Sequence, residues 1–212
     1  MEHFYENIQG WCDGIETLYK LVAGNSRDGD HFVEIGCWRG KSSAFMAVEL
    51  INSGKQVRFD CVDTWKGSEE HQEGGTNFDP AVLDDTLYND FLANMKPVEG
   101  RFNPVRMPSV EAATLYEDNS LDFVFIDGAH DYDSVMADVA AWFPKVKSGG
   151  VIAGHDLPSP SSASSNNVFR QSIPRHNWLL GCLQAIINIF IKRPFRHSSR
   201  YTNSASLCYN IT

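Results

Sequence analysis

Residues 32–40 read FVEIGCWRG, an apolar run that ends in a glycine and is followed by a short turn and a second glycine. The apolar run predicts a buried strand, and the segment KSSAFMAVELI at 41–51 has the length and composition of a helix. In open α/β sheets, ligands bind where a strand ends, and glycines there let the backbone approach a ligand closely. The stretch therefore predicts a ligand-binding unit built around Gly36 and Gly40.

The same alternation continues along the chain. We expect further strands at 56–63, 103–107, 121–127 and 148–156, and helices at 3–24, 79–95 and 133–143. Residues 66–78 are polar, Gly-rich and aperiodic, which predicts a loop after the second strand. Strands that alternate with helices predict an α/β domain with a Rossmann-like, doubly wound, mostly parallel sheet covered by helices on both faces.

Charge is unevenly distributed. Residues 1–156 contain 12 Lys and Arg against 27 Asp and Glu, a net charge of −15, whereas residues 157–212 contain six basic residues and no acidic one. An acidic body disfavours nucleic acid as a partner, and a neutral, sugar-like small molecule is easier to accommodate. The five cysteines form no CxxC pair and the first residues do not resemble a secretory signal, so we expect a cytoplasmic protein with reduced thiols. The sequence leaves open whether the chain forms a homo-oligomer.

Composition divides the chain into a catalytic domain at 1–157 and a tail at 158–212, which begins as a Ser-rich linker. Three interpretations of the tail compete. A helix at 178–191 and a final strand could complete the sheet. The helix and the basic cluster KRPFR could form an interfacial membrane anchor, although 14 residues are too few to span a bilayer. Loss of the coding frame near residue 158 would explain the missing acids.

Two carboxylates argue for a particular cofactor. The chain has no GxGxxG, so a dinucleotide turn is not supported. Glu34 would repel a pyrophosphate but suits a cationic ligand such as S-adenosylmethionine. Asp63 ends the next strand, where a carboxylate can accept hydrogen bonds from ribose hydroxyls. The structural alternatives are a salt-bridged strand end for Glu34 and a helix N-cap for Asp63.

Four segments, FVEIGCWRGKSS, CVDTWKGS, LDFVFIDGAHDY and KSGGVIAGHD, resemble in order and spacing the class I S-adenosylmethionine-dependent methyltransferases of the methyltransferase domain 24 family. The resemblance covers about residues 30–157. It implies a seven-stranded sheet whose last strand is antiparallel if the tail completes it. Together with the residue arguments above, it gives a candidate cofactor set of Glu34, Gly36, Gly40, Ser42, Asp63, Trp65, Ser109 and Asp127.

Polar residues also follow the fourth and fifth expected strands. Asp127, His155 and Asp156 can converge at the ligand edge and are candidate ligands for Mg²⁺ or a similar divalent ion. His130 is the candidate base that takes an acceptor's hydroxyl proton. The layout is similar to that of metal-dependent O-methyltransferases of macrolide sugars, except that His155 stands where those enzymes have an acid. The alternatives are a helix cap at His130 and a hydrogen-bonded turn at 155–156.

We therefore expect S-adenosylmethionine-dependent O-methylation of a sugar or another small hydroxyl-bearing acceptor. One alternative is a catalytically inactive cofactor-binding module with a defective C-terminus. Others are an NAD-dependent oxidoreductase and a hydrolase, although no GxSxG elbow supports the latter. Trp142 has the helical spacing of a core residue, and Trp38 is expected to pack within the protein.

Overall fold

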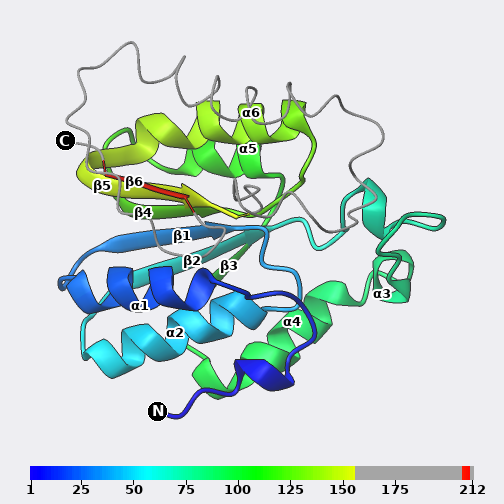
Figure 1. Cartoon of the computed structure of the whole chain (residues 1–212), viewed down its shortest axis with the longest axis horizontal. Coiled ribbons are helices and arrows are strands. Elements are labelled where there is room, and N and C mark those ends of the chain that lie inside the picture. The colour runs from blue at the N-terminus through cyan, green and yellow to red at the C-terminus, as the bar shows by residue number, and fades with distance from the viewer. Residues whose placement is uncertain (156–206, 211–212) are drawn as a thin grey trace, which may run out of the picture.

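The protein is built around one β-sheet. The computed structural model describes residues 1–155 and 207–210. The strands are β1 (His31–Ile35), β2 (Arg58–Asp63), β3 (Asn103–Arg106), β4 (Leu121–Ile126), β5 (Val146–Gly154) and β6 (Leu207–Asn210). The helices are α1 (Ile15–Asn25), α2 (Lys41–Ser53), α3 (Pro80–Leu83), α4 (Leu87–Met95), α5 (Ser109–Ala112) and α6 (Tyr132–Trp142). Helices cover both faces of the sheet, with α5 and α6 on one face and α1, α2 and α4 on the other (Figure 1).

The strand order confirms the predicted Rossmann-like α/β class. Within the described residues the sheet has six strands, in the order β3-β2-β1-β4-β5-β6. β1 to β5 run parallel to one another, and β6 is antiparallel to β5. The seventh strand that the resemblance implies is not in these parts of the chain. The chain order reverses between β1 and β4, which is the switch point where open α/β sheets bind ligands.

Two apolar cores hold the sheet in place. Phe123 and Phe125 of β4 pack with residues of α1, α2 and α4 on one face, and Val124 packs with residues of α5 and α6 on the other. Burial of apolar surface on both faces is the main stabilising contribution, and it holds the strand ends in fixed positions. Trp142 of α6 is fully buried, as its spacing predicts.

The N-terminal segment contains less helix than its apolar spacing predicts. A regular helix begins only at Ile15, after a single 3-10 turn at Tyr5–Asn7. Gly10 and Gly14 adopt φ angles of 136° and 84°, which interrupt a right-handed helix and favour glycine. Ile8 is nevertheless buried in the core beside α1 and α2. The apolar spacing therefore identified the buried side chains, but the predicted helix at 3–24 was wrong over its first half.

The segment after β2 also differs from the prediction. The expected loop at 66–78 contains a 3-10 turn, η2 (Glu69–His71), and the expected helix at 79–95 is divided into α3 and α4. Asp85 lies between these helices with a φ of 52°, a left-handed conformation that ends a helix. Asp79 caps α3 by accepting a backbone N–H with its side chain. Local capping and a left-handed residue thus interrupt the apolar period.

The predicted features of the tail fall largely outside the described residues. This holds for the domain boundary at 157–158, the Ser-rich linker, the apolar helix at 178–191 and the basic cluster. Four tail residues form β6, which pairs with β5 and is the edge strand on that side of the sheet. In the parts of the chain that the structure describes, no helix combines the length and apolar character needed to cross a membrane.

Candidate functional site at the carboxyl-terminal edge of the sheet

The strand ends beside the switch point are joined by backbone hydrogen bonds. The N–H groups of Gly36, Asp127 and His155 donate to β2, β1 and β4 at 2.9, 2.8 and 3.3 Å. Each loop thus leaves the sheet at the same level. We define the carboxyl-terminal edge as Gly36, Asp63, Asp127, His130 and His155. The predicted convergence of these strand ends is present, because parallel strands deliver their last residues to one side.

Gly36 and Gly40 are needed for contacts within the chain. A Cβ on Gly36 would lie 2.0 Å from the carbonyl oxygen of Asp127, and the φ of Gly36 is 84°. A Cβ on Gly40, whose φ is 87°, would come within about 3 Å of side chains of α4. The prediction was that these glycines let a ligand approach. Close packing of the neighbouring loop and helix already requires glycine at both positions.

Asp63 joins the loops that follow β1 and β2. Its Oδ2 accepts the backbone N–H groups of Cys37 and Trp38 at 2.8 and 2.9 Å, and its Oδ1 accepts that of Trp65 at 2.7 Å. Burial raises the pKa of Asp63, and these N–H donors act against that rise. The carboxylate therefore has a structural role, although it caps loop turns and not the helix proposed as an alternative.

Glu34 requires a correction, because it lies beneath the edge and not on it. Its side chain is 1% exposed, and its two oxygens accept the hydroxyls of Tyr19 at 3.0 Å and Ser43 at 2.5 Å. Burial raises its pKa to about 7, although hydrogen bonds from Ser42, Ser43 and Tyr19 lower it. Ser42 is buried in the same layer. Hydroxyl groups enclose Glu34, in place of the cationic ligand that was expected or the salt bridge that was the structural alternative.

Trp65 also needs correction as a cofactor contact. Its ring is fully buried between Tyr88 and Phe91, with both ring centroids at 4.7 Å. Its indole N–H donates to the carbonyl of Trp38 at 2.9 Å. These contacts place the side chain in the core beside α4, where it cannot line the edge. Trp38, expected to pack within the protein, contacts the ring of His71 at 4.2 Å.

Ser109 was expected to contact the cofactor, and the structure gives its hydroxyl other partners. Ser109 is the first residue of α5, and its Oγ accepts the indole N–H of Trp142 at 2.8 Å. The same hydroxyl bonds to Asp138, where it opposes the rise in pKa that burial causes. Ser109 thus ties α5 to α6. The sequence could not reveal this, because the partners lie about 30 residues later.

Asp127, His130 and His155 do come together. Asp127 Oδ1 lies 3.6 Å from His130 Nε2 and 3.7 Å from His155 Nδ1, and the Asp127 side chain is 19% exposed. His155 Nε2 lies 3.2 Å from the carbonyl oxygen of Asp13, which anchors that ring to the segment before α1. The proposed alternative of a helix cap at His130 is wrong, because Asp131 caps α6. Asp156 lies outside the described residues.

Sequence reasoning missed Glu70, which lies in the insertion after β2. Its Oε1 is 3.0 Å from His130 Nδ1. The acidic residues of the insertion were visible in the sequence, but no local pattern indicates which of them reaches a residue 60 positions away. A carboxylate that none of the motifs contains therefore lies beside the carboxyl-terminal edge.

The described residues also contain one buried group with the spacing of metal ligands. The ligand atoms of Glu34, Cys37 and Cys61 all lie within 4.8 Å of one another. Burial raises the pKa of both thiols, which disfavours the thiolates that bind metals. Both Glu34 oxygens already accept hydroxyl hydrogens. This chemistry fits a dry packing contact better than a metal site.

Comparison with known families identifies the family of the chain that contains this edge. A model of a methyltransferase domain matches residues 33–157, more than half of the chain. The chain belongs to this methyltransferase family. The resemblance to class I S-adenosylmethionine-dependent enzymes is thereby confirmed, and the comparisons give no support to an oxidoreductase. The methyltransferase match begins in β1 and runs past the end of β5, so it contains the whole carboxyl-terminal edge.

A relative and several solved structures resemble this methyltransferase. The protein y4gI of Sinorhizobium fredii strain NGR234, described as uncharacterized, is 29% identical over 157 residues, which are 73% of this chain and 16% of that protein. The O-methyltransferase NovP has a TM-score of 0.61 at 16% identity, covering 98% of this chain and 79% of NovP. Cofactor-bound Rv0187 from MTB has a TM-score of 0.60 at 15% identity, covering 93% and 78%. These structures share the fold.

Proposed function

We propose that this methyltransferase transfers the methyl group of S-adenosylmethionine to a hydroxyl oxygen of a small, sugar-like acceptor. The observation that carries the proposal is the meeting of Asp127, His130 and His155 at the switch-point edge, with Asp127 Oδ1 between the two imidazoles at 3.6 and 3.7 Å. An imidazole placed there is suited to accept a hydroxyl proton. The similarity to NovP, an O-methyltransferase, supports transfer to oxygen.

In the proposed reaction, the acceptor oxygen attacks the methyl carbon in line with the departing sulfur. The O–C bond forms as the C–S bond breaks, and the sulfonium becomes a neutral thioether. The hydroxyl proton passes to His130. The main contribution of the protein is to hold donor and acceptor in reactive geometry, because orientation can lower the barrier by about 7 to 11 kcal/mol.

The cofactor would lie across the loops after β1 and β2. Asp63 is only partly buried, and its Oδ1, which accepts the backbone N–H of Trp65, is the oxygen that we propose for a ribose hydroxyl. Asp127 lies at the strand end and adds negative charge that favours the sulfonium and ammonium groups. Gly36, Gly40, Glu34 and Ser42 shape and support this surface from within. Trp65 and Ser109 have no part in our proposal for cofactor contact.

A divalent ion would be held by Asp127, His155 and Asp156. The two ligands in the described part of the chain fit such an ion, since a carboxylate oxygen and an imidazole nitrogen face each other at 3.7 Å. An imidazole in the set favours a transition metal ion over Mg²⁺. When bound, the ion would supply positive charge that favours an ionised acceptor hydroxyl. His130 would still receive the proton.

Calorimetric titration with S-adenosylhomocysteine and, separately, with NAD tests the cofactor. Each titration is made with and without Mg²⁺ or Mn²⁺. We expect binding of S-adenosylhomocysteine alone, and at least a tenfold loss of affinity in Asp63→Ala. Asp118→Ala, at an exposed site far from this edge, is the control. Equal affinity of Asp63→Ala and wild type would refute the assignment of Asp63.

A screen with radiolabelled S-adenosylmethionine tests the acceptor. Sugar and phenolic hydroxyl compounds are compared with amines and thiols. Label transferred to a hydroxyl compound supports the proposal. Cofactor binding without transfer to any acceptor class would favour the inactive cofactor-binding module.

A further inference from the structure

We propose that Glu70 is a positioning residue for His130, which holds the imidazole with its proton on Nδ1 and directs Nε2 toward the acceptor. This inference rests on the proposed role of His130 as the base. Glu70 belongs to the insertion after β2, outside the four motifs that resemble the family. The insertion would thus complete the reaction site as well as connect two elements.

The Glu70 carboxylate is held on more than one side. Its Oε1 lies 3.0 Å from His130 Nδ1 and accepts the Ser68 hydroxyl at 3.3 Å, and its Oε2 accepts the Asn77 amide at 3.1 Å. The Glu70 side chain is 15% exposed, so solvent screens the contact only in part. An ionised carboxylate can only accept hydrogen bonds, so an imidazole nitrogen that is hydrogen-bonded to it carries the hydrogen.

The two ring nitrogens of His130 consequently differ. Nδ1 lies within hydrogen-bond distance of Glu70 in the insertion, whereas Nε2 lies 3.6 Å from Asp127 Oδ1 at the strand end, which is longer than a hydrogen bond. Which nitrogen of a histidine is protonated is set by the hydrogen bond that the other nitrogen makes. With the hydrogen on Nδ1, the neutral ring presents the lone pair of Nε2 at the edge where the acceptor hydroxyl would arrive. Glu70 therefore selects the tautomer that can act as a base.

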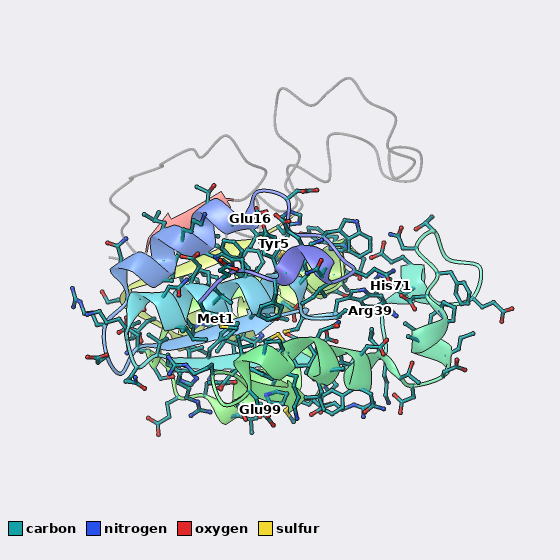
Figure 2. The ribbon with its side chains drawn as sticks, turned by 90° about the horizontal axis from the view of Figure 1, so that it is seen from below. Met1, Tyr5, Glu16, Arg39, His71 and Glu99 are labelled. Carbon is teal, nitrogen blue, oxygen red and sulfur yellow. The ribbon has the colours of Figure 1, made fainter. Side chains whose placement is uncertain are left out.

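The turn that carries Glu70 is anchored to the loop after β1. Ser68 and His71 form a reciprocal capping box around η2, and the His71 ring packs on Trp38 at 4.2 Å. Arg39 makes two hydrogen bonds of 2.9 Å to Asp79 at the far end of the insertion. Arg39 and His71 lie where the insertion meets the body of the domain (Figure 2). The loop that follows Gly36 thus also positions Glu70.

Nitrogen NMR of the full chain tests this inference without an acceptor. Protein labelled with ¹⁵N-histidine is studied at increasing alkaline pH until the His130 signals stop changing, so that the neutral ring dominates. The His130 signals are those lost in His130→Asn. We expect the Nδ1–H form in wild type, a change to the Nε2–H form in Glu70→Ala, and retention of Nδ1–H in Glu70→Gln, which keeps an acceptor oxygen. Glu73→Gln, an exposed neighbour, is the matched control and should leave the spectrum unchanged.

The wild-type spectrum alone can overturn the inference, since an Nε2–H form of His130 contradicts it. An unchanged tautomer in a folded Glu70→Ala protein would do the same. S-adenosylhomocysteine affinity is measured on every variant and should stay within about twofold of wild type. If wild type fails to bind S-adenosylhomocysteine, the proposed function fails, while the tautomer still decides the role of Glu70.

Discussion

The two ends of the parallel sheet each contain a central carboxylate, but in different surroundings. Where the strands begin, Asp60 is fully buried and receives hydrogen bonds from four side chains at 2.8 to 3.2 Å, those of His31, Arg58, Asn103 and Tyr116. Where they end, Asp127 is 19% exposed and faces two imidazole nitrogens at 3.6 and 3.7 Å. One carboxylate is saturated at short distances, and the other lies farther from its neighbours and closer to solvent.

The different surroundings give the two carboxylates different roles: one stabilises the fold, and the other is accessible to a ligand. Burial would raise the pKa of Asp60, but hydrogen bonds from His31, Arg58 and Tyr116 outweigh it and hold the pKa below its usual value. The ionised group is thus stabilised by the fold itself. Asp127 keeps acceptor capacity at the switch point, so a cation or hydroxyl can still gain from it. Substitutions at the two ends should therefore affect different quantities.

The largest effect is expected at the carboxyl-terminal edge. His130→Asn should lower the rate of methyl transfer by about 10² to 10⁴-fold, because it removes the proposed proton acceptor. The affinity for S-adenosylhomocysteine should change little, and the free energy of unfolding by less than about 0.5 kcal/mol. Single-turnover kinetics and calorimetry measure the rate and the affinity. If His130→Asn lost affinity for S-adenosylhomocysteine but kept the wild-type rate of methyl transfer, the proposed role of His130 as proton acceptor would be wrong.

At the opposite end, Asp60→Asn should lower the free energy of unfolding by about 3 to 5 kcal/mol, because it leaves buried donors without their ionic partner. Urea denaturation measures this loss. Asp118→Asn is the matched control, since the Asp118 side chain is 62% exposed and its ion pair with Lys145 should contribute no more than about 1 kcal/mol. Equal free energies of unfolding for the two variants would show that the hydrogen bonds to Asp60 do not stabilise the fold.

Glu34, buried under the edge, should make stability depend on pH. Its folded pKa is raised to about 7, so its stabilising contribution is fully present below the unfolded value of about 4.3 and is lost as the pH rises through 7. Wild type should lose up to about 3 kcal/mol relative to Glu34→Gln over that range. Denaturant titrations at several pH values measure the difference. Glu117→Gln, at an exposed position, should show no such trend.

The smallest effect concerns the anchor of the insertion. Asp79→Ala removes the N-cap of α3 and the paired hydrogen bonds to Arg39. Arg39 keeps its ion pair with Asp90, so the loss should be only about 1 to 2 kcal/mol, and residues 66–85 should loosen. Limited proteolysis measured beside urea denaturation separates local opening from global unfolding. Asp84→Ala, exposed at the end of the same helix, is the control. Equal cleavage rates would show that the Arg39 pair is dispensable.

Much of the fold could be predicted from local sequence. The strands from β1 to β5, together with α2 and α6, lie within a few residues of their predicted ranges, because apolar runs and helical spacing report burial directly. The errors at 3–24 and 79–95 occurred where Gly14 and Asp85 adopt left-handed conformations. Glycine at position 14 hinted at a break, whereas Asp85 gave no such signal.

The site was predictable where it depends on strand ends. Asp63, Asp127, His130 and His155 reach the expected edge because each one ends a parallel strand or follows one within a few residues. Residue type alone could not distinguish an edge residue from one beneath it. Glu34, Trp65 and Ser109 had suitable chemistry, but their partners in α1, α2, α4 and α6 occupy them.

By itself, the sequence determined the order of strands and helices, the methyltransferase motifs and the residues that follow each strand. These features are local, since hydrophobic periodicity and turn residues act over a few positions. Only the tertiary structure decided which polar atoms are enclosed and that Glu70 lies beside His130. Burial and hydrogen bonding depend on segments that are distant in the chain, and their meeting is set by the packing of the whole sheet.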